Sequence, residues 1–263
     1  MTFFTSSPLW IAAVVFLGLG TLIAMLGPLV VRSLVPLQAL RTNNEVAGFK
    51  FATVGVLYAV LLAFAVLVVW EKLNDAENEV AREAATAATI FRLADGMEPK
   101  TRLAVREATS AYLVSAIGAD WPAMARGGES PATSLALSDI YVAILRDEPA
   151  SARGGAILQE GLRQLDLLTQ ARRSRIVLAA GVVPDIVWTA LLIGAAVTVG
   201  FTFFFGADNV RAQAAMTGAL GFLIFSGLLV IVAIDRPFAG SVHVEPQPLI
   251  TVLEDFGGAA SAD

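Results

Sequence analysis

The 263-residue chain is 56% hydrophobic and only 16% charged, with a mean hydropathy of +0.70. Soluble domains carry about a quarter charged residues, so this composition excludes an ordinary soluble globular protein. The net charge of −5, without any basic run, argues against a nucleic-acid partner. The absence of cysteine excludes disulfides, thiolate chemistry and cysteine-ligated metals.

Charged residues are concentrated in the middle of the chain. Of the 18 Lys/Arg, 13 lie between residues 71 and 183, as do 15 of the 23 Asp/Glu. The flanking stretches contain nearly uncharged runs of about twenty residues, the length that a helix needs to cross a hydrocarbon core of roughly 30 Å. Each backbone amide must be satisfied within its own segment in a bilayer, so these runs are predicted to be helices.

The sequence therefore predicts an all-α integral membrane protein with four transmembrane helices in two hairpins. The expected spans are residues 9–31, 49–70, 183–205 and 213–234. The expected parts are a first hairpin (1–70), a water-exposed helical bundle (71–183) inserted between spans two and three, a second hairpin (184–234) and an irregular tail (235–263). Trp10, Trp70 and Trp188 fall near predicted span ends, where amphipathic rings prefer to sit.

Two further expectations concern the membrane arrangement. Residues 1–8 carry no Lys or Arg, and the apolar run that follows is longer than a signal-peptide core, so it is expected to be a retained span. An even number of spans puts both termini and the bundle on one side. Six Lys/Arg flank the spans on that side and four on the other, so the positive-inside rule favours a cytoplasmic location of the termini and the bundle. The expected location of the protein is the inner membrane of the cell.

Breakers divide the central segment into four amphipathic helices, which fit a compact bundle. Residues 71–94 continue span two, and Gly96 and Pro99 separate this helix from the next. Loops are expected at residues 121–128, and between the spans at 32–48 and 206–212. Two more bundle helices are expected to begin near Pro131 and Ala152.

Enzyme signatures are missing from the sequence. There is one histidine, His243, and neither a phosphate-binding glycine loop nor a Gly-x-Ser-x-Gly motif. We therefore expect no catalytic residue, no metal site and no cofactor, and we interpret His243 as a surface residue.

Polar residues at the span edges have two interpretations each. Asp185 begins span three, either as a helix cap at the positive end of the helix dipole or as part of an ion path. Arg41, Asn44 and Glu45 precede span two. They form either a capped hairpin turn or an ion vestibule, in which a ring of Arg41 side chains raises the local anion concentration.

Span two is the candidate pore helix. Val56, Val60 and Phe64 form an apolar stripe that, in a ring of subunits, would make a neck that gates by dewetting. The neighbouring stripe of Gly55, Ala59 and Ala63 has the small side chains that membrane helices use to approach each other. The alternative is that both stripes pack against other helices.

These features resemble a bacterial family of four-span membrane proteins described as bestrophin-like. The resemblance covers nearly the whole chain, from the loop before span two to the segment after span four. It rests on Asn44-Glu45, Ala47-Gly48-Phe49, residues 55–64, Trp70-Glu71, Glu83-Ala84, Tyr112, Trp121-Pro122, Met124, Ala171-Arg172-Arg173, Pro184, Trp188, Asp235, Pro237-Phe238 and Gly240.

The chain is similar, more distantly, to the bestrophins, which are pentamers with an anion pore lined by span two. This resemblance implies a homo-oligomer in a lipid bilayer, a pentamer by analogy, that conducts inorganic anions such as chloride. Two segments depart from the bestrophin pattern. Apolar residues 65–69 replace a polar segment, and residues 241–244 replace a calcium-binding acidic run, so calcium gating is not implied.

Two hypotheses of function follow. The first is an oligomeric ion channel, anion-conducting, with span two lining the pore. The alternative is a non-conducting membrane scaffold or sensor whose cytoplasmic bundle binds a partner. A membrane enzyme has no residue support.

Overall fold

Helices are the regular secondary structure of the part of the chain that the structure describes. The computed structural model describes residues 9–149, 151–181, 183–240 and 242–260, and no β-strand occurs among them. The expected all-helical class is therefore confirmed. Residues 1–8 and Ser241, which entered the expectations above, lie outside the described residues.

The described residues divide into two compact units. One contains the residues up to Glu71, residues 183–236, Gly240 and Val242, and the other contains 72–181, 237–239 and the residues from His243 onward. The helices of the first unit are α2 (Leu9–Ala13), the π-helix η1 (Val14–Leu19), α3 (Gly20–Leu34), α4 (Leu37–Arg41), the first part of α5 (Asn44–Leu93), α10 (Asp185–Thr202) and α11 (Val210–Ile234). The helices of the second unit are the rest of α5, the 3₁₀-helix η2 (Ala94–Gly96), α6 (Pro99–Ser115), the π-helix η3 (Ala116–Asp120), α7 (Trp121–Met124), α8 (Pro131–Leu145), α9 (Ala152–Leu178) and α12 (Gln247–Ala260).

Several of these helices have the length and composition of membrane spans. Among the described residues, four helical stretches qualify: Val14–Leu34, Asn44–Gly96, Asp185–Thr202 and Val210–Ile234. They coincide with the four apolar runs of the sequence. The long apolar helices are thus confirmed, and the number of membrane crossings stays a prediction.

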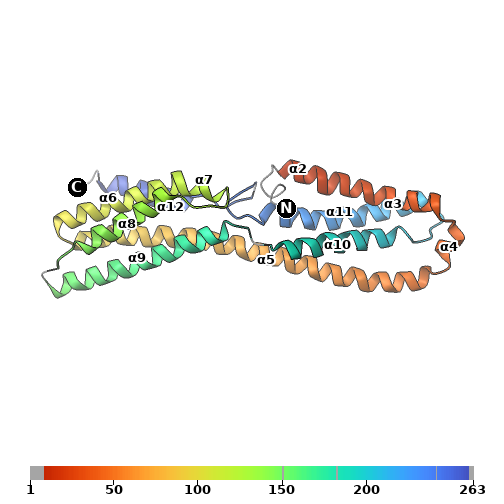
Figure 1. Ribbon diagram of the computed structural model, residues 1–263, viewed down its shortest axis with the longest axis horizontal. Coiled ribbons are helices and arrows are strands. Elements are labelled where there is room, and N and C mark those ends of the chain that lie inside the picture. The colour runs from red at the N-terminus through yellow and green to blue at the C-terminus, as the bar shows by residue number, and fades with distance from the viewer. Residues whose placement is uncertain (1–8, 150, 182, 241, 261–263) are drawn as a thin grey trace. The chain divides into compact units, whose positions relative to one another are not determined.

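Helix α3 lies alongside α11 in the first unit (Figure 1). Glycines allow this close approach: a Cβ atom on Gly221 would lie 2.6 Å from the Ala24 Cβ, and one on Gly20 would lie 2.7 Å from the Phe225 ring. Small residues at helix contacts are the usual means of tight packing in membranes. Substitution at either glycine would force the two helices apart.

The three tryptophans expected near span ends differ in their exposure. Trp10 and Trp70 are exposed, whereas Trp188 is buried. The reason is helical spacing, since Trp188 shares the buried face of α10 with Leu191 and Ala195. Packing within the unit therefore decides the position of this ring.

The connection between the first two long helices is more ordered than the loop expected at residues 32–48. Helix α4 fills part of it, and α5 already begins at Asn44. The Asn44 side chain joins this connection to Gly206, donating to the carbonyl oxygen and accepting from the amide, both at 2.9 Å. A Cβ atom at Gly206 would lie 2.7 Å from the Arg41 backbone nitrogen, so the close approach requires glycine.

In the second unit, α6 packs against α8, α8 against α9, and α12 against α6 (Figure 1). Helices α6, α8 and α9 begin at Pro99, Pro131 and Ala152, where the sequence signals predict helix starts. The loop expected at residues 121–128 begins instead with the short helix α7.

The tail differs from the expected irregular segment, because α12 occupies Gln247–Ala260. Leu249 and Phe256, seven residues apart on one face, are both buried. The Phe256 ring stacks on Phe91 with a centroid distance of 3.7 Å. Pro248 falls in the first turn, where proline is tolerated, so tertiary burial outweighs the breaker signals of this segment.

We expect Asn44→Ala to destabilise the first unit by about 1–3 kcal/mol, because it removes two hydrogen bonds and leaves a half-buried backbone amide without its partner. The thermal unfolding midpoint in detergent measures the effect. Asn43→Ala is the matched control, since Asn43 is exposed and makes no side-chain hydrogen bond within the described residues. Equal midpoints for the two variants would contradict the role given to Asn44.

Candidate functional site

The membrane part of α5 has two unlike faces. Val56, Val60 and Phe64 are 64%, 48% and 62% exposed, whereas Tyr58 and Ala65 on the other side are buried. The exposed residues recur every four positions, so they form one stripe along the helix. The described residues of the same chain leave this apolar stripe uncovered.

The stripe of small residues is uncovered as well. A Cβ atom on Gly55 would meet nothing within 4 Å, and Ala59 and Ala63 are exposed. The described helices of the same chain therefore cover neither stripe. Their surface is available to lipid, water or another copy of the chain.

The buried face of α5 is held by close contacts with α10 and α11. Phe51 packs its ring edge-on against Phe205 at a centroid distance of 5.7 Å. The Tyr58 ring lies against Gly194, where a Cβ would come within 2.5 Å of its Cδ2 atom. The contact between Leu62 and Gly227 is similarly close. These contacts fix which face of α5 is left open.

The vestibule candidates lie at the end of α4 and the start of α5. Arg41 forms an ion pair with Asp208, and Glu45 is exposed, while the Asn44 side chain is hydrogen-bonded to the Gly206 backbone. Asn44 therefore links the two connections, and Arg41 carries a charge that is partly neutralised. Basic residues still outnumber acidic ones in these connections and the adjoining helix ends: Arg32, Arg41, Lys50 and Arg211 against Glu45 and Asp208.

Asp185 is exposed in the first turn of α10, one residue after the N-cap Pro184. A carboxylate in this position interacts favourably with the positive end of the helix dipole. Asp235, just after the end of α11, is buried and accepts a hydrogen bond from the Val183 amide at 2.8 Å. It therefore also ties the end of α11 to the start of α10.

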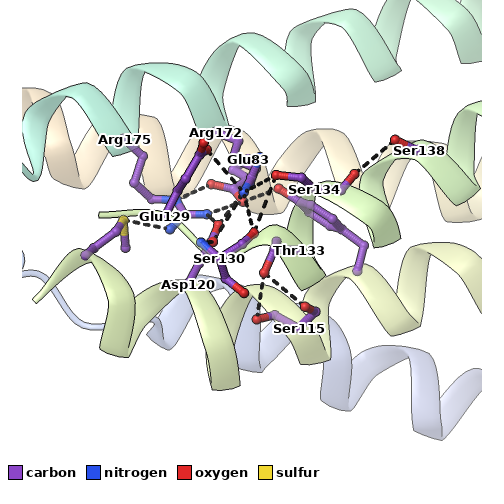
Figure 2. Close-up of polar contacts among 12 residues, drawn as sticks. Glu83, Ser115, Asp120, Glu129, Ser130, Thr133, Ser134, Ser138, Arg172 and Arg175 are labelled. Carbon is purple, nitrogen blue, oxygen red and sulfur yellow. Dashed lines mark hydrogen bonds and ion pairs between the residues drawn. The ribbon is translucent and has the colours of Figure 1, made fainter. Parts of the chain in front are cut away.

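A buried ion cluster forms the polar centre of the second unit. Figure 2 shows Arg172 and Arg175 reaching from α9 toward Glu83 of α5 and Asp120 of η3. All four side chains are at least nine-tenths buried. Two carboxylates face two guanidinium groups, so the cluster is formally neutral, which is the condition under which buried charges are tolerated.

Hydrogen bonds satisfy the cluster almost completely. Glu83 accepts from Arg175 Nε at 2.6 Å, from Arg175 Nη2 at 2.9 Å and from the Tyr112 hydroxyl at 2.5 Å. Asp120 accepts from Arg172 Nε at 2.9 Å and from the Ser130 amide at 2.9 Å. These hydrogen bonds within the cluster hold α5, α6, η3 and α9 together.

The protonation states of the cluster are held by their surroundings. Burial raises the pKa of the Tyr112 hydroxyl well above its ordinary value, and the Glu83 charge raises it further. Burial by itself lowers the pKa of the Arg175 guanidinium, but Glu83 more than compensates, and the net pKa is raised. Tyr112 thus stays a neutral donor and Arg175 stays charged throughout the physiological pH range.

Sequence reasoning assigned no role to this cluster. A signal was present on α9, where Arg172 and Arg175 follow Leu165 and Leu168 at helical spacing and so lie on the buried face. Their partner Glu83 is 92 residues away from Arg175 in the chain, a pairing that periodicity cannot reveal. Among the described residues, no group of three or more His, Asp or Glu is placed to hold a metal ion.

Comparisons with known proteins identify a family of similar sequences and crystal structures with a similar fold. The sequence matches the family model of the Bestrophin-like domain over residues 18–249. No curated protein matches the chain in sequence. The structure is similar to crystal structures of two single-substitution variants of a bacterial bestrophin homologue from Klebsiella pneumoniae. One is 14% identical with a TM-score of 0.70, covering 92% of this chain and 98% of that chain. The other is 13% identical with a TM-score of 0.69, covering 94% and 98%.

A third crystal structure, described as that of a membrane protein, is 13% identical with a TM-score of 0.65 and covers 91% of this chain and 97% of its own. At such identities the likeness shows the fold alone. The fold and its long apolar helices define a helical membrane protein. The family match covers most of the chain, and the chain belongs to the bestrophin-like family.

We expect Glu83→Gln to destabilise the second unit by about 3–5 kcal/mol, because it leaves the buried Arg175 without a full counter-charge. The thermal unfolding midpoint followed by circular dichroism measures this. Glu160→Gln is the matched control, since Glu160 pairs with Arg163 on the surface of α9 and its loss should change the midpoint little. A Glu83→Gln midpoint equal to that of the unchanged protein would contradict the structural role of the cluster.

Proposed function

We propose that the chain is the subunit of an oligomeric ion channel, anion-conducting, with the membrane part of α5 lining the pore. The observation that carries this proposal is the uncovered apolar stripe of Val56, Val60 and Phe64 on a helix whose opposite face is fixed by its own chain. Membership of the bestrophin-like family and the fold shared with a bacterial bestrophin homologue support it.

The proposed membrane arrangement has four crossings in two hairpins in the inner membrane. The bundle of residues 71–183 stands between the second and third crossings, with both termini on its side, in the cytoplasm. The four long apolar helices and the excess of Lys/Arg flanking the spans on that side support this arrangement.

The proposal requires several copies of the chain, because one lining helix per chain cannot enclose a pore. The uncovered stripe of Gly55, Ala59 and Ala63 is suited to close contact with a neighbouring copy. We propose a homo-oligomer, a pentamer by family analogy. The adjacent stripe then forms an apolar neck, and Asp185 stays a lesser candidate for an ion path.

The excess of basic residues in the connections of the first unit favours anions over cations. Four basic residues stand there against two acidic ones, Glu45 and Asp208. Repeated around a ring, this excess attracts chloride toward the proposed vestibule of Arg41, Asn44 and Glu45.

Chloride flux from liposomes containing the purified protein tests the proposal. We expect flux with the unchanged protein and a several-fold increase with Phe64→Ala, because a wider and less apolar neck wets more readily. Ile193→Ala is the matched control, since Ile193 is an exposed apolar residue of α10, and its flux should be unchanged. An intact oligomer without flux in any variant would overturn the channel proposal.

Asp208→Asn should raise chloride flux at low ionic strength, because it releases the Arg41 charge from its ion pair. The increase should be several-fold at about 10 mM salt and vanish near 1 M, where the Debye length falls to about 3 Å. Asp139→Asn, an equal change of charge on an exposed residue of α8, is the control. Identical salt dependence of the flux for the two variants would contradict the proposal that the Arg41 charge attracts anions at the vestibule.

One observation favours the alternative of a scaffold or sensor. The second unit has an open cavity of about 690 Å³, lined by Phe91, Leu103, Arg106 and Phe256 among others. Such a surface suits partner binding. The flux assay separates the two functions, because a scaffold gives no flux.

A further inference from the structure

Two arginines stand at the same level where α3 ends and α11 begins in the first unit. The two helices run antiparallel, as three close contacts show: Gly20 with Phe225, Ala24 with Gly221 and Met25 with Gly218. Arg32 lies seven residues after Met25 on α3. Arg211 lies seven residues before Gly218 on α11. Seven residues make almost two helical turns, so this register places Arg32 and Arg211 across the helix contact from each other.

Neither guanidinium group has a counter-charge. Within the described residues, the side chains of Arg32 and Arg211 make no ion pair and no hydrogen bond. Asp208, the acidic residue nearest to Arg211 in the chain, is paired with Arg41. Two like charges on facing positions repel each other, and a partly buried charge without a partner is costly.

The helix dipoles account for one arginine and not for the other. Arg32 lies in the last turn of α3, where the dipole is negative and favours a cation. Arg211 lies in the first turn of α11, where the dipole is positive and disfavours one. The helix ends therefore leave the positive charge of the pair uncompensated.

The Arg32 guanidinium is enclosed on one side only. Arg32 is half-buried, and its Nη1 atom is buried without a hydrogen-bond partner. The Nε and Nη2 atoms are not enclosed in this way, so they are the donors that remain for a ligand. Because the charge is delocalised over the planar group, an anion at these two donors compensates it without reaching Nη1.

We propose that Arg32 and Arg211 together bind the phosphate group of an anionic glycerophospholipid. Guanidinium groups match phosphate oxygens with paired, charge-assisted hydrogen bonds. Both arginines lie at ends of helices that have the length and composition of membrane spans, which is the level of the lipid headgroups. An anionic lipid is favoured over a zwitterionic one, because the pair offers no carboxylate to an ammonium group.

Apolar side chains beside the two arginines suit the acyl chains of the same lipid. Within one helical turn of Arg32, Leu29 and Val30 are 39% and 55% exposed. On α11, Met216 is 65% exposed and follows Arg211 by five residues. A free phosphate ion would contact none of these apolar groups, whereas a phospholipid matches both the charged and the apolar part of the surface.

This site is separate from the proposed pore stripe. The stripe lies on the face of α5 turned away from α10 and α11, whereas the two arginines belong to α3 and α11. A phosphodiester carries one negative charge, so a net positive charge stays on the pair. The basic excess in the connections is then reduced and not removed. The proposal does not depend on conduction.

Thermal unfolding of the delipidated full-length protein in a neutral detergent tests the proposal, with phosphatidylglycerol as the probe. A ligand that binds the folded state alone raises the melting temperature, and we expect a rise of about 3–5 °C. Diacylglycerol with the same acyl chains lacks the phosphate, and inorganic phosphate lacks the acyl chains. An equal rise with either of these would overturn the proposal.

The double variant Arg32→Gln with Arg211→Gln removes both charges. We expect the rise with phosphatidylglycerol to shrink at least fivefold, while the melting temperature without lipid stays equal or increases, because the repulsion is gone. Native mass spectrometry of the same samples counts bound phosphatidylglycerol without heating, and the bound fraction should fall equally. An undiminished rise or bound fraction in the double variant would overturn the proposal.

Lys50→Gln is the matched control for Arg32→Gln alone. Lys50 is an exposed cation at the start of α5, and its side chain makes no ion pair within the described residues. We expect Arg32→Gln to lose at least half of the rise with phosphatidylglycerol and Lys50→Gln to keep it. Equal losses in the two variants would show general attraction of the lipid to a basic surface and would overturn the site.

Discussion

The unequal faces of α5 are the constraint on which the functional account depends. Gly194 and Gly227 let α10 and α11 approach one side of the helix so closely that its rotation is fixed. The side left over carries Val56, Val60 and Phe64, an apolar surface that no other described residue of the chain covers. An apolar surface of this kind must meet lipid, a neighbouring copy or a narrow pore, and the proposed function assigns it to the last two.

The same helix contributes to both units. Helix α5 runs for 50 residues without a proline, and its later part carries Glu83. The first part of α5 exposes apolar side chains, whereas this later part buries a charged one. Ion pairs and hydrogen bonds among Glu83, Arg175, Arg172 and Asp120 compensate the cost of burying this charge. Removing one partner is costly, so the cluster fixes which face of α5 enters the second unit.

The sequence alone predicts the structural features that depend on a local residue pattern. The apolar runs predict the long helices because length and hydropathy decide which segments can cross a bilayer, and Pro99 and Pro131 mark helix starts. Helix α12 was missed because its stability comes from burial of Leu249 and Phe256, which its proline and glycine residues obscure. The ion cluster was missed because it joins residues far apart in the chain.

The chain has no cysteine, so a single introduced thiol reports its own environment. The most direct test of the account is the reaction of Val60→Cys, in the assembled protein in liposomes, with a water-soluble, negatively charged thiol reagent. If copies of α5 surround a water-filled axis, Val60→Cys reacts and chloride flux falls, while Ile193→Cys on α10 stays unmodified. If Val60→Cys reacts only with a lipid-soluble reagent even when combined with Phe64→Ala, which is expected to wet the neck, the exposed face of α5 meets acyl chains, and the proposed pore does not exist.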